Sequence, residues 1–159
     1  MYRASEVAGY TRVPASTLRT WAFGRTSPKR YPAVIKAADK RNTECLSFIN
    51  LIEAHVLVAL RHTHNVPLKK IKSAVSWLKK ETGKEHPLAE LEIDTDGLNV
   101  FIQHFGDIVS ASEQGQIHIR EVVEKFLERV ERDRYGMPVL FYPFTFDNID
   151  RECPKDVVI

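Results

Sequence analysis

The chain has 159 residues, 43% of them hydrophobic, which is enough for a packed core and argues against a disordered chain. No apolar run approaches the roughly 18 residues of a membrane-spanning helix, and the N-terminus lacks a signal-peptide pattern, so we expect a cytoplasmic protein without a membrane partner. The net charge of +2 is the sum of +11 in residues 1–80 (15 Lys and Arg minus 4 Asp and Glu) and −9 in residues 81–159 (8 minus 17). Solubility does not require such a separation of charge. The basic first half is therefore expected to bind a polyanion.

Two short helices, over residues 5–10 and 14–22, are predicted at the start of the chain. Ser5 can cap the first helix, and Pro14 suits the first turn of the second. Only residues 11–13 separate them. Two short helices joined this tightly are typical of a helix-turn-helix, although an incidental helical hairpin is the alternative.

Five positions of this segment fit the inward-facing pattern of a helix-turn-helix, in which a small residue lies where the helices cross. They are Val7, Ala8, Val13, Leu18 and Trp21. Arg12 stands at the turn position that often carries glycine. A left-handed conformation there would cost on the order of 1 kcal/mol, which a packed helix pair can absorb.

The second helix would lie in the major groove of DNA with its N-terminal half toward the bases. Ser16 and Thr20 would then point outward, and Thr17 is divided between the groove and a capping role. Arg19 is the best candidate for a phosphate contact or a guanine contact, with a solvated surface arginine as the alternative. Arg12 adds a positive charge near the start of this helix.

A wing is predicted after this helix. Residues 31–38 and 43–48 are expected to form two strands around the polar tip 39–42. Basic side chains that could reach a flanking phosphate are Arg25, Lys29, Arg30, Lys40 and Arg41. Each of them, taken alone, is equally well explained as a solvated charge.

Two longer helices follow, over residues 49–62 and 67–81, because apolar residues recur in them at helical spacing. Gly83 is expected to end the second helix. Residues 1–82 are therefore expected to form a winged helix-turn-helix that binds DNA.

The acidic half has a different pattern. Two apolar runs within residues 90–103 flank Asp96-Gly97, which predicts a β-hairpin. Residues 115–119 and 138–144 resemble strands, and residues 120–133 predict an amphipathic helix.

The predicted fold class is α+β. The winged helix-turn-helix is followed by a small α+β region over residues 83–143, for interaction or dimerisation, and by a linker or the start of a further domain over residues 144–159. The apolar end Val157-Val158-Ile159 leads us to expect that the natural chain continues and that residues 156–159 open a further strand.

The motif "YRASEVAGYTRVPASTLRTWAFG" resembles the opening of a MerR-type winged helix-turn-helix, and "HNVPLKKIKSAV" resembles a later segment of that family. The usual glycine-tyrosine-arginine wing and the long dimerising helix with metal or drug ligands have no counterpart. The chain is more similar to VapB-type antitoxins with a MerR-like N-terminal domain, through "RYPAVIKAAD", "LSFINLIEAHVLVALR" and "GQIHIREVVEKFLERVERDRYG". This likeness covers most of residues 2–143.

The resemblance implies a homodimer that binds double-stranded DNA at its own promoter, represses its operon and neutralises a cognate PIN-like ribonuclease toxin. A symmetric operator also calls for a symmetric dimer. Two alternatives stay open: a protein-interaction module that docks an acidic partner without DNA, and a MerR-like regulator unrelated to toxin–antitoxin systems.

Neither catalysis nor a cofactor is expected. No nucleophile motif or Gly-rich phosphate loop occurs. His62-x-His64 has no third metal ligand at a useful spacing. The acidic residues 91–96 are better explained as a solvated hairpin than as a magnesium site. Cys45 and Cys153 are expected to be reduced thiols.

Overall fold

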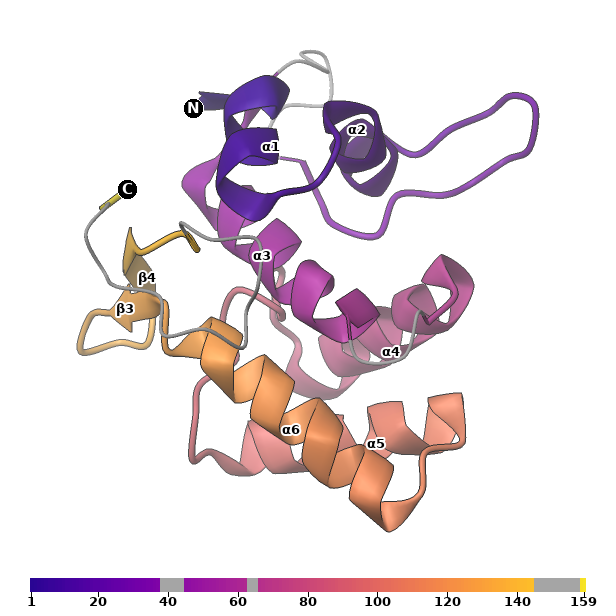
Figure 1. Ribbon diagram of the computed structural model, residues 1–159, viewed down its shortest axis with the longest axis vertical. Coiled ribbons are helices and arrows are strands. Elements are labelled where there is room, and N and C mark those ends of the chain that lie inside the picture. The colour runs from indigo at the N-terminus through magenta and orange to yellow at the C-terminus, as the bar shows by residue number, and fades with distance from the viewer. Residues whose placement is uncertain (38–44, 63–65, 145–157) are drawn as a thin grey trace.

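The computed structural model describes residues 1–37, 45–62, 66–144 and 158–159. Within these ranges the chain forms six helices and two small antiparallel sheets, with the N-terminal helices at one end and α5 and α6 at the other (Figure 1). The elements in chain order are β1 Tyr2–Arg3, α1 Ala4–Thr11, α2 Ala15–Phe23, β2 Cys45–Leu46, α3 Phe48–His62, α4 Leu68–Thr82, α5 Asp96–Val109, α6 Glu113–Leu127, β3 Val130–Arg132 and β4 Pro138–Phe141.

The four helices expected in the basic half are confirmed, each within two residues of its predicted bounds at either end. Gly83 ends α4 with a φ of 67° and donates its N–H to Lys79 O, as expected of a glycine after a helix. The periodic apolar residues of α4 are buried, among them Ile71, Val75 and Leu78.

The predicted hairpin of residues 31–38 and 43–48 is wrong where the structure describes it. Cys45–Leu46 pairs with Tyr2–Arg3 instead, and no strand forms within residues 31–37. Those residues are held by other elements, because Val34 and Ile35 both donate their N–H groups to the Trp21 carbonyl at the end of α2. The predicted tip, residues 39–42, lies outside the described residues.

The hairpin predicted within residues 90–103 is also wrong. Asp96 and Gly97 open α5, and Thr95 caps this helix by accepting a hydrogen bond from Leu98 N at 3.3 Å. The apolar residues assigned to a second strand, Leu98, Phe101 and Ile102, lie on the buried side of the helix.

Residues 115–119 are helical rather than extended. They belong to α6, which Ser112 caps through the N–H of Gly115. Ile119 is fully buried on the same side as Val122 and Val123, so the helical period of the next segment begins earlier than expected. The predicted helix over residues 120–133 ends at Leu127, and β3 follows.

The strand predicted over residues 138–144 is confirmed over Pro138–Phe141, which is β4 and pairs with β3. Phe141 of β4 also exchanges two backbone hydrogen bonds with Ile159, at 3.0 and 2.9 Å. Residues 158 and 159 belong to no strand, and residues 156 and 157 lie outside the described residues, so the strand expected over residues 156–159 stays a prediction.

One cluster of buried side chains runs from Val7 to Phe141. Helix α3 lies at its centre: Leu51, Ile52 and Leu57 are fully buried, and α3 packs against α1, α2, α4 and α6. None of the helices in the described part of the chain is long and apolar enough to span a bilayer. The division into domains at residue 82 stays a prediction.

Candidate nucleic-acid interface

Helices α1 and α2 are joined by a tight turn at Arg12, which has a left-handed conformation with φ 58° and ψ 31°. Pro14 precedes α2, and its carbonyl accepts hydrogen bonds from Thr17 N at 2.9 Å and Leu18 N at 3.1 Å. Proline is tolerated at this position because a backbone N–H at the start of a helix has no hydrogen-bond partner within the helix. The left-handed conformation of Arg12 costs more free energy for an arginine than it would for a glycine.

The inward side of α2 is formed as the sequence predicts. Leu18 and Trp21 are 0% and 2% exposed, and Val7 of α1 is fully buried in the same core. Ala8 is half-buried and packs against this core. This packing fixes the orientation of α2, so its remaining side is turned away from the protein.

The outward side of α2 carries the predicted polar residues. Ser16 is exposed, and Thr17, Arg19 and Thr20 are half-buried. The Thr20 hydroxyl donates to the Ser16 carbonyl at 3.0 Å, so its oxygen is left to accept a hydrogen bond from a partner. No side-chain hydrogen bond caps α2, so the capping role considered for Thr17 is not used.

A cleft of about 330 Å³ lies at the N-terminal end of α2. Arg12 and Thr17 line it together with Arg61 from the last turn of α3. Two guanidinium groups beside the positive end of a helix make this cleft suited to an anion such as a DNA phosphate. The sequence does not single out Arg61, because helical spacing places it on the outer side of residues 49–62 like an ordinary surface residue.

A basic loop follows α2. Arg25 and Tyr31 exchange two backbone hydrogen bonds of 2.7 Å, and the Arg25 guanidinium lies 4.9 Å from the centre of the Tyr31 ring. Lys29 and Arg30 are exposed in the loop that this contact closes, which extends beside α2 (Figure 1). Residues 25–31 therefore form a basic loop between α2 and the segment for which a wing is predicted.

Gly24 connects α2 to this loop and has a φ of 75°. A Cβ at this position would lie 2.6 Å from the Tyr31 carbonyl oxygen, which is closer than atoms can approach. Glycine is therefore required for the loop to fold back on the end of α2.

Buried polar groups hold the segment after the loop. The Asn50 amide donates to Lys36 O at 2.8 Å and to the Glu53 carboxylate at 3.1 Å. His86 lies 3.1 Å from the same carboxylate, and this hydrogen bond raises the pKa of His86. Both Asn50 and Glu53 are at most 1% exposed, so this network fixes the segment against α3.

The predicted contact residues thus fall into groups. Ser16, Thr17, Arg19 and Thr20 share α2, Arg12 and Thr17 share the cleft, and Arg25, Lys29 and Arg30 share the loop. Lys40 and Arg41 lie outside the described residues.

A metal site is not found in the described part of the chain, where no three His, Cys, Asp or Glu side chains lie close enough to hold an ion. His64 falls outside that part, so the His62-x-His64 pair is not tested.

Residues 1–75 match the family described as "Putative DNA-binding HTH domain". The match covers α1, the turn at Arg12 and α2, and it extends through α3 into α4. No curated protein and no solved structure matches the chain. The match shows a helix-turn-helix in the N-terminal half and supports DNA binding.

Proposed function

We propose, on the premise that residues 1–75 contain a helix-turn-helix, that the protein is a sequence-specific DNA-binding repressor of its own promoter, without enzymatic activity. Helix α2 enters the major groove, with Ser16, Thr17, Arg19 and Thr20 toward the bases. Arg12 and the basic loop contact the flanking phosphates.

The observation that carries this proposal is the packing of α1 against α2. Leu18 and Trp21 of α2 are buried in the core, so the polar side of α2 is directed outward. The loop beside it contains Arg25, Lys29 and Arg30. A repressor that reads a symmetric operator would act as a homodimer.

Salt dependence of binding tests the proposal. Fluorescence anisotropy with a duplex from the protein's own promoter should show nanomolar affinity and a loss of about 10³–10⁵ in affinity between 50 and 200 mM salt, as expected for about 6–10 phosphate contacts. An unrelated duplex of equal length should bind far more weakly. Equal binding of the two duplexes, or no binding at 50 mM salt, would contradict the proposal.

We further propose that the protein serves as the antitoxin of a toxin–antitoxin operon. The resemblance to VapB-type antitoxins supports this role, as does an acidic second half that DNA would repel and that a protein partner could use. The adjacent reading frame should then encode a small PIN-like ribonuclease. Its activity on RNA should be lost when the two proteins are mixed in equimolar amounts.

A further inference from the structure

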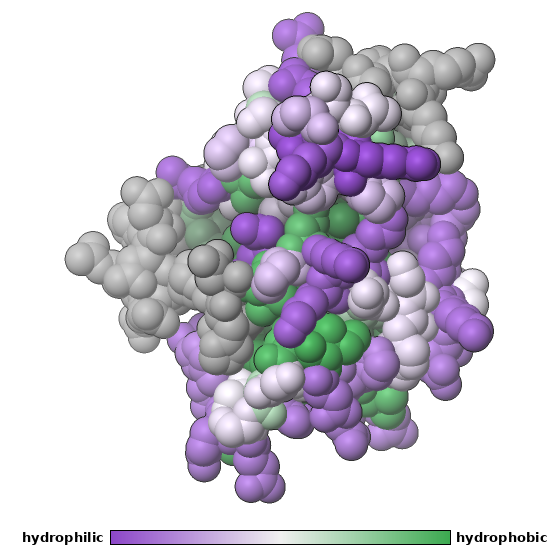
Figure 2. Space-filling view, turned by 90° about the vertical axis from the view of Figure 1, so that its right-hand side faces the viewer, coloured by the Kyte–Doolittle hydropathy of each residue, from purple (hydrophilic) through white to green (hydrophobic). Residues whose placement is uncertain are grey.

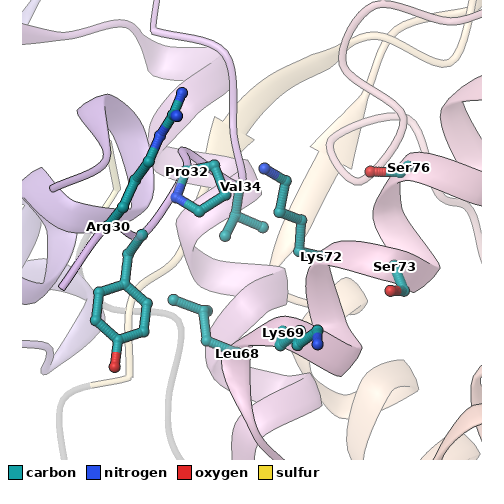
Figure 3. Close-up of a pocket in the computed structure, with 9 residues that line it drawn as sticks. Arg30, Pro32, Val34, Leu68, Lys69, Lys72, Ser73 and Ser76 are labelled. Atoms are coloured by element: carbon teal, nitrogen blue, oxygen red, sulfur yellow. The ribbon is translucent and has the colours of Figure 1, made fainter. Parts of the chain in front are cut away.

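A groove lies between residues 30–34, which follow α2, and the first turns of α4. Its volume is about 630 Å³, within the range typical of small-molecule sites. One wall is formed by Arg30 and Val34, and the other by the first turns of α4 (Figure 3).

The groove combines an apolar floor with a cationic rim. Val34 and Leu68 supply half-buried apolar surface, and Arg30, Lys69 and Lys72 supply three positive charges. Among the described residues that line it there is no Asp or Glu. Figure 3 shows the Lys72 side chain extending from α4 toward the opposite wall.

The apolar floor and the cationic rim together indicate which class of ligand the groove can bind. Phosphate oxygens of DNA need only exposed cations and gain nothing from an apolar floor. An organic anion satisfies both parts, since its apolar body would cover Val34 and Leu68 while its charged end meets the lysines. The wider face that contains this loop and α4 is mostly hydrophilic with a hydrophobic area within it (Figure 2).

Both walls of the groove are fixed by contacts with the rest of the fold. Val34 donates its N–H to Trp21 O at 2.7 Å, and the next residues are held by Asn50 through the Lys36 carbonyl. On the other side, Leu68 begins α4, whose Ile71 is fully buried in the core. A groove between two fixed walls can bind a ligand without a large ordering cost.

We propose that this groove is a binding site for a small organic anion: a carboxylate, sulfonate or phosphate attached to an aromatic or branched apolar body. The groove contains none of the α2 side chains proposed to read DNA, although Arg30 belongs both to the groove and to the basic loop. The anion site does not depend on whether the protein is a repressor, because Lys69 and Lys72 of α4 supply its other two charges.

Anilinonaphthalene sulfonate is a suitable probe, because it is an aromatic anion that fluoresces in apolar surroundings. We expect saturable binding at one site. The Lys69→Met/Lys72→Met variant should raise the Kd at least tenfold, because the substitution keeps chain length and removes the charges. Lys80→Met, on the exposed side of the same helix, is the matched control and should leave the Kd unchanged.

Two further measurements separate this groove from other apolar surfaces. Ser73→Phe, an exposed groove residue, should fill the site and abolish binding while the lysines remain. Phenylnaphthylamine, which lacks the sulfonate, should bind at least tenfold more weakly than the anion. The proposal is overturned if the double lysine variant binds the anion as the wild type does. It is also overturned if that variant loses affinity for duplex DNA alone, which would make the lysines a DNA contact.

Discussion

Arg19 is the side chain of α2 on which we expect sequence recognition to depend most. Arg19→Ala should weaken binding to the promoter duplex by about 1–3 kcal/mol, or roughly five- to 150-fold, because a guanidinium contact to a base edge or phosphate is lost. The thermal unfolding curve should not change, since Leu18 and Trp21, not Arg19, pack in the core. Anisotropy and circular dichroism measure the two effects.

Arg134→Ala provides the matched control, because Arg134 is an exposed arginine in the acidic half. It should leave DNA affinity unchanged. If Arg19→Ala and Arg134→Ala behave alike, the assignment of α2 as the recognition helix is wrong.

His55 is the residue that should make the fold sensitive to acid. It is buried against Phe126 and Phe141, and its Nε2 lies 2.8 Å from the Phe126 carbonyl. Burial lowers its pKa from 6.5 to about 4. The folded protein therefore binds fewer protons than the unfolded chain between these pH values, and the free energy of unfolding should fall as the pH drops through this window, by roughly 3 kcal/mol.

Urea unfolding of the wild type and of His55→Gln at pH 7 and pH 4.5 measures this dependence. Glutamine can still donate to the carbonyl but does not titrate, so the variant should lose less stability between the two pH values. His86 has the opposite sign: its raised pKa gives stability that is present at low pH and lost as the pH rises through the folded pKa. Equal losses in wild type and His55→Gln would show that His55 is not the sensor.

At the scale of elements, α5 depends on its N-cap. The Thr95 hydroxyl accepts from Leu98 N and donates to the Glu92 carbonyl at 2.8 Å. Thr95→Ala should cost about 1 kcal/mol and lower the Tm by about 2–4 °C, whereas Thr95→Ser should retain most of the stability. Differential scanning calorimetry of the two variants distinguishes loss of the cap from loss of the methyl group, since equal costs would exclude the cap.

The residues at the start of α5 also explain why the sequence predicts a hairpin here. Asp96-Gly97 is a common turn pair, but Thr95 followed by Asp96 is also a helix start, and only the burial of Leu98, Phe101 and Phe105 on one side decides between them. Helices α3 and α4 were predictable because their apolar residues recur over 15 residues each. The shorter helices α1 and α2 were predictable from their start signals and from the inward-facing pattern of a helix-turn-helix.

The position of the loop after α2 could not be predicted, since tertiary contacts set it. Val34 and Ile35 look like strand residues, yet their N–H groups bond to the end of α2 rather than to a neighbouring strand. Likewise, the polar residues predicted to contact DNA from α2 follow from helical spacing, whereas Arg61 joins Arg12 only through the packing of α3. Long-range packing of this kind leaves no local signal.

At the scale of the whole molecule, α3 links the basic and acidic halves. His55 on α3 is hydrogen-bonded to the backbone of α6 at Phe126, and its ring packs against the Phe126 ring with the ring centres 4.7 Å apart. A fragment of residues 1–82 would expose this side of α3, so we expect it to lose fixed tertiary packing while keeping helical content. Near- and far-ultraviolet circular dichroism of the fragment and the full chain test this.

A fragment with native near-ultraviolet signal and cooperative unfolding would contradict that expectation. It would instead support an independent DNA-binding domain ending at residue 82.

The stacking of Trp77 of α4 on His104 of α5 gives the molecule an optical reporter. The ring centres are 3.8 Å apart and the planes 18° from parallel, so the emission of Trp77 should respond to any change in this contact. The chain contains only one other tryptophan, Trp21 on α2. In Trp21→Phe, the emission would change as α4 and α5 separate and Trp77 becomes exposed to water. In Trp77→Phe, it would follow the surroundings of α2, so the two ends of the molecule can be observed independently without a label.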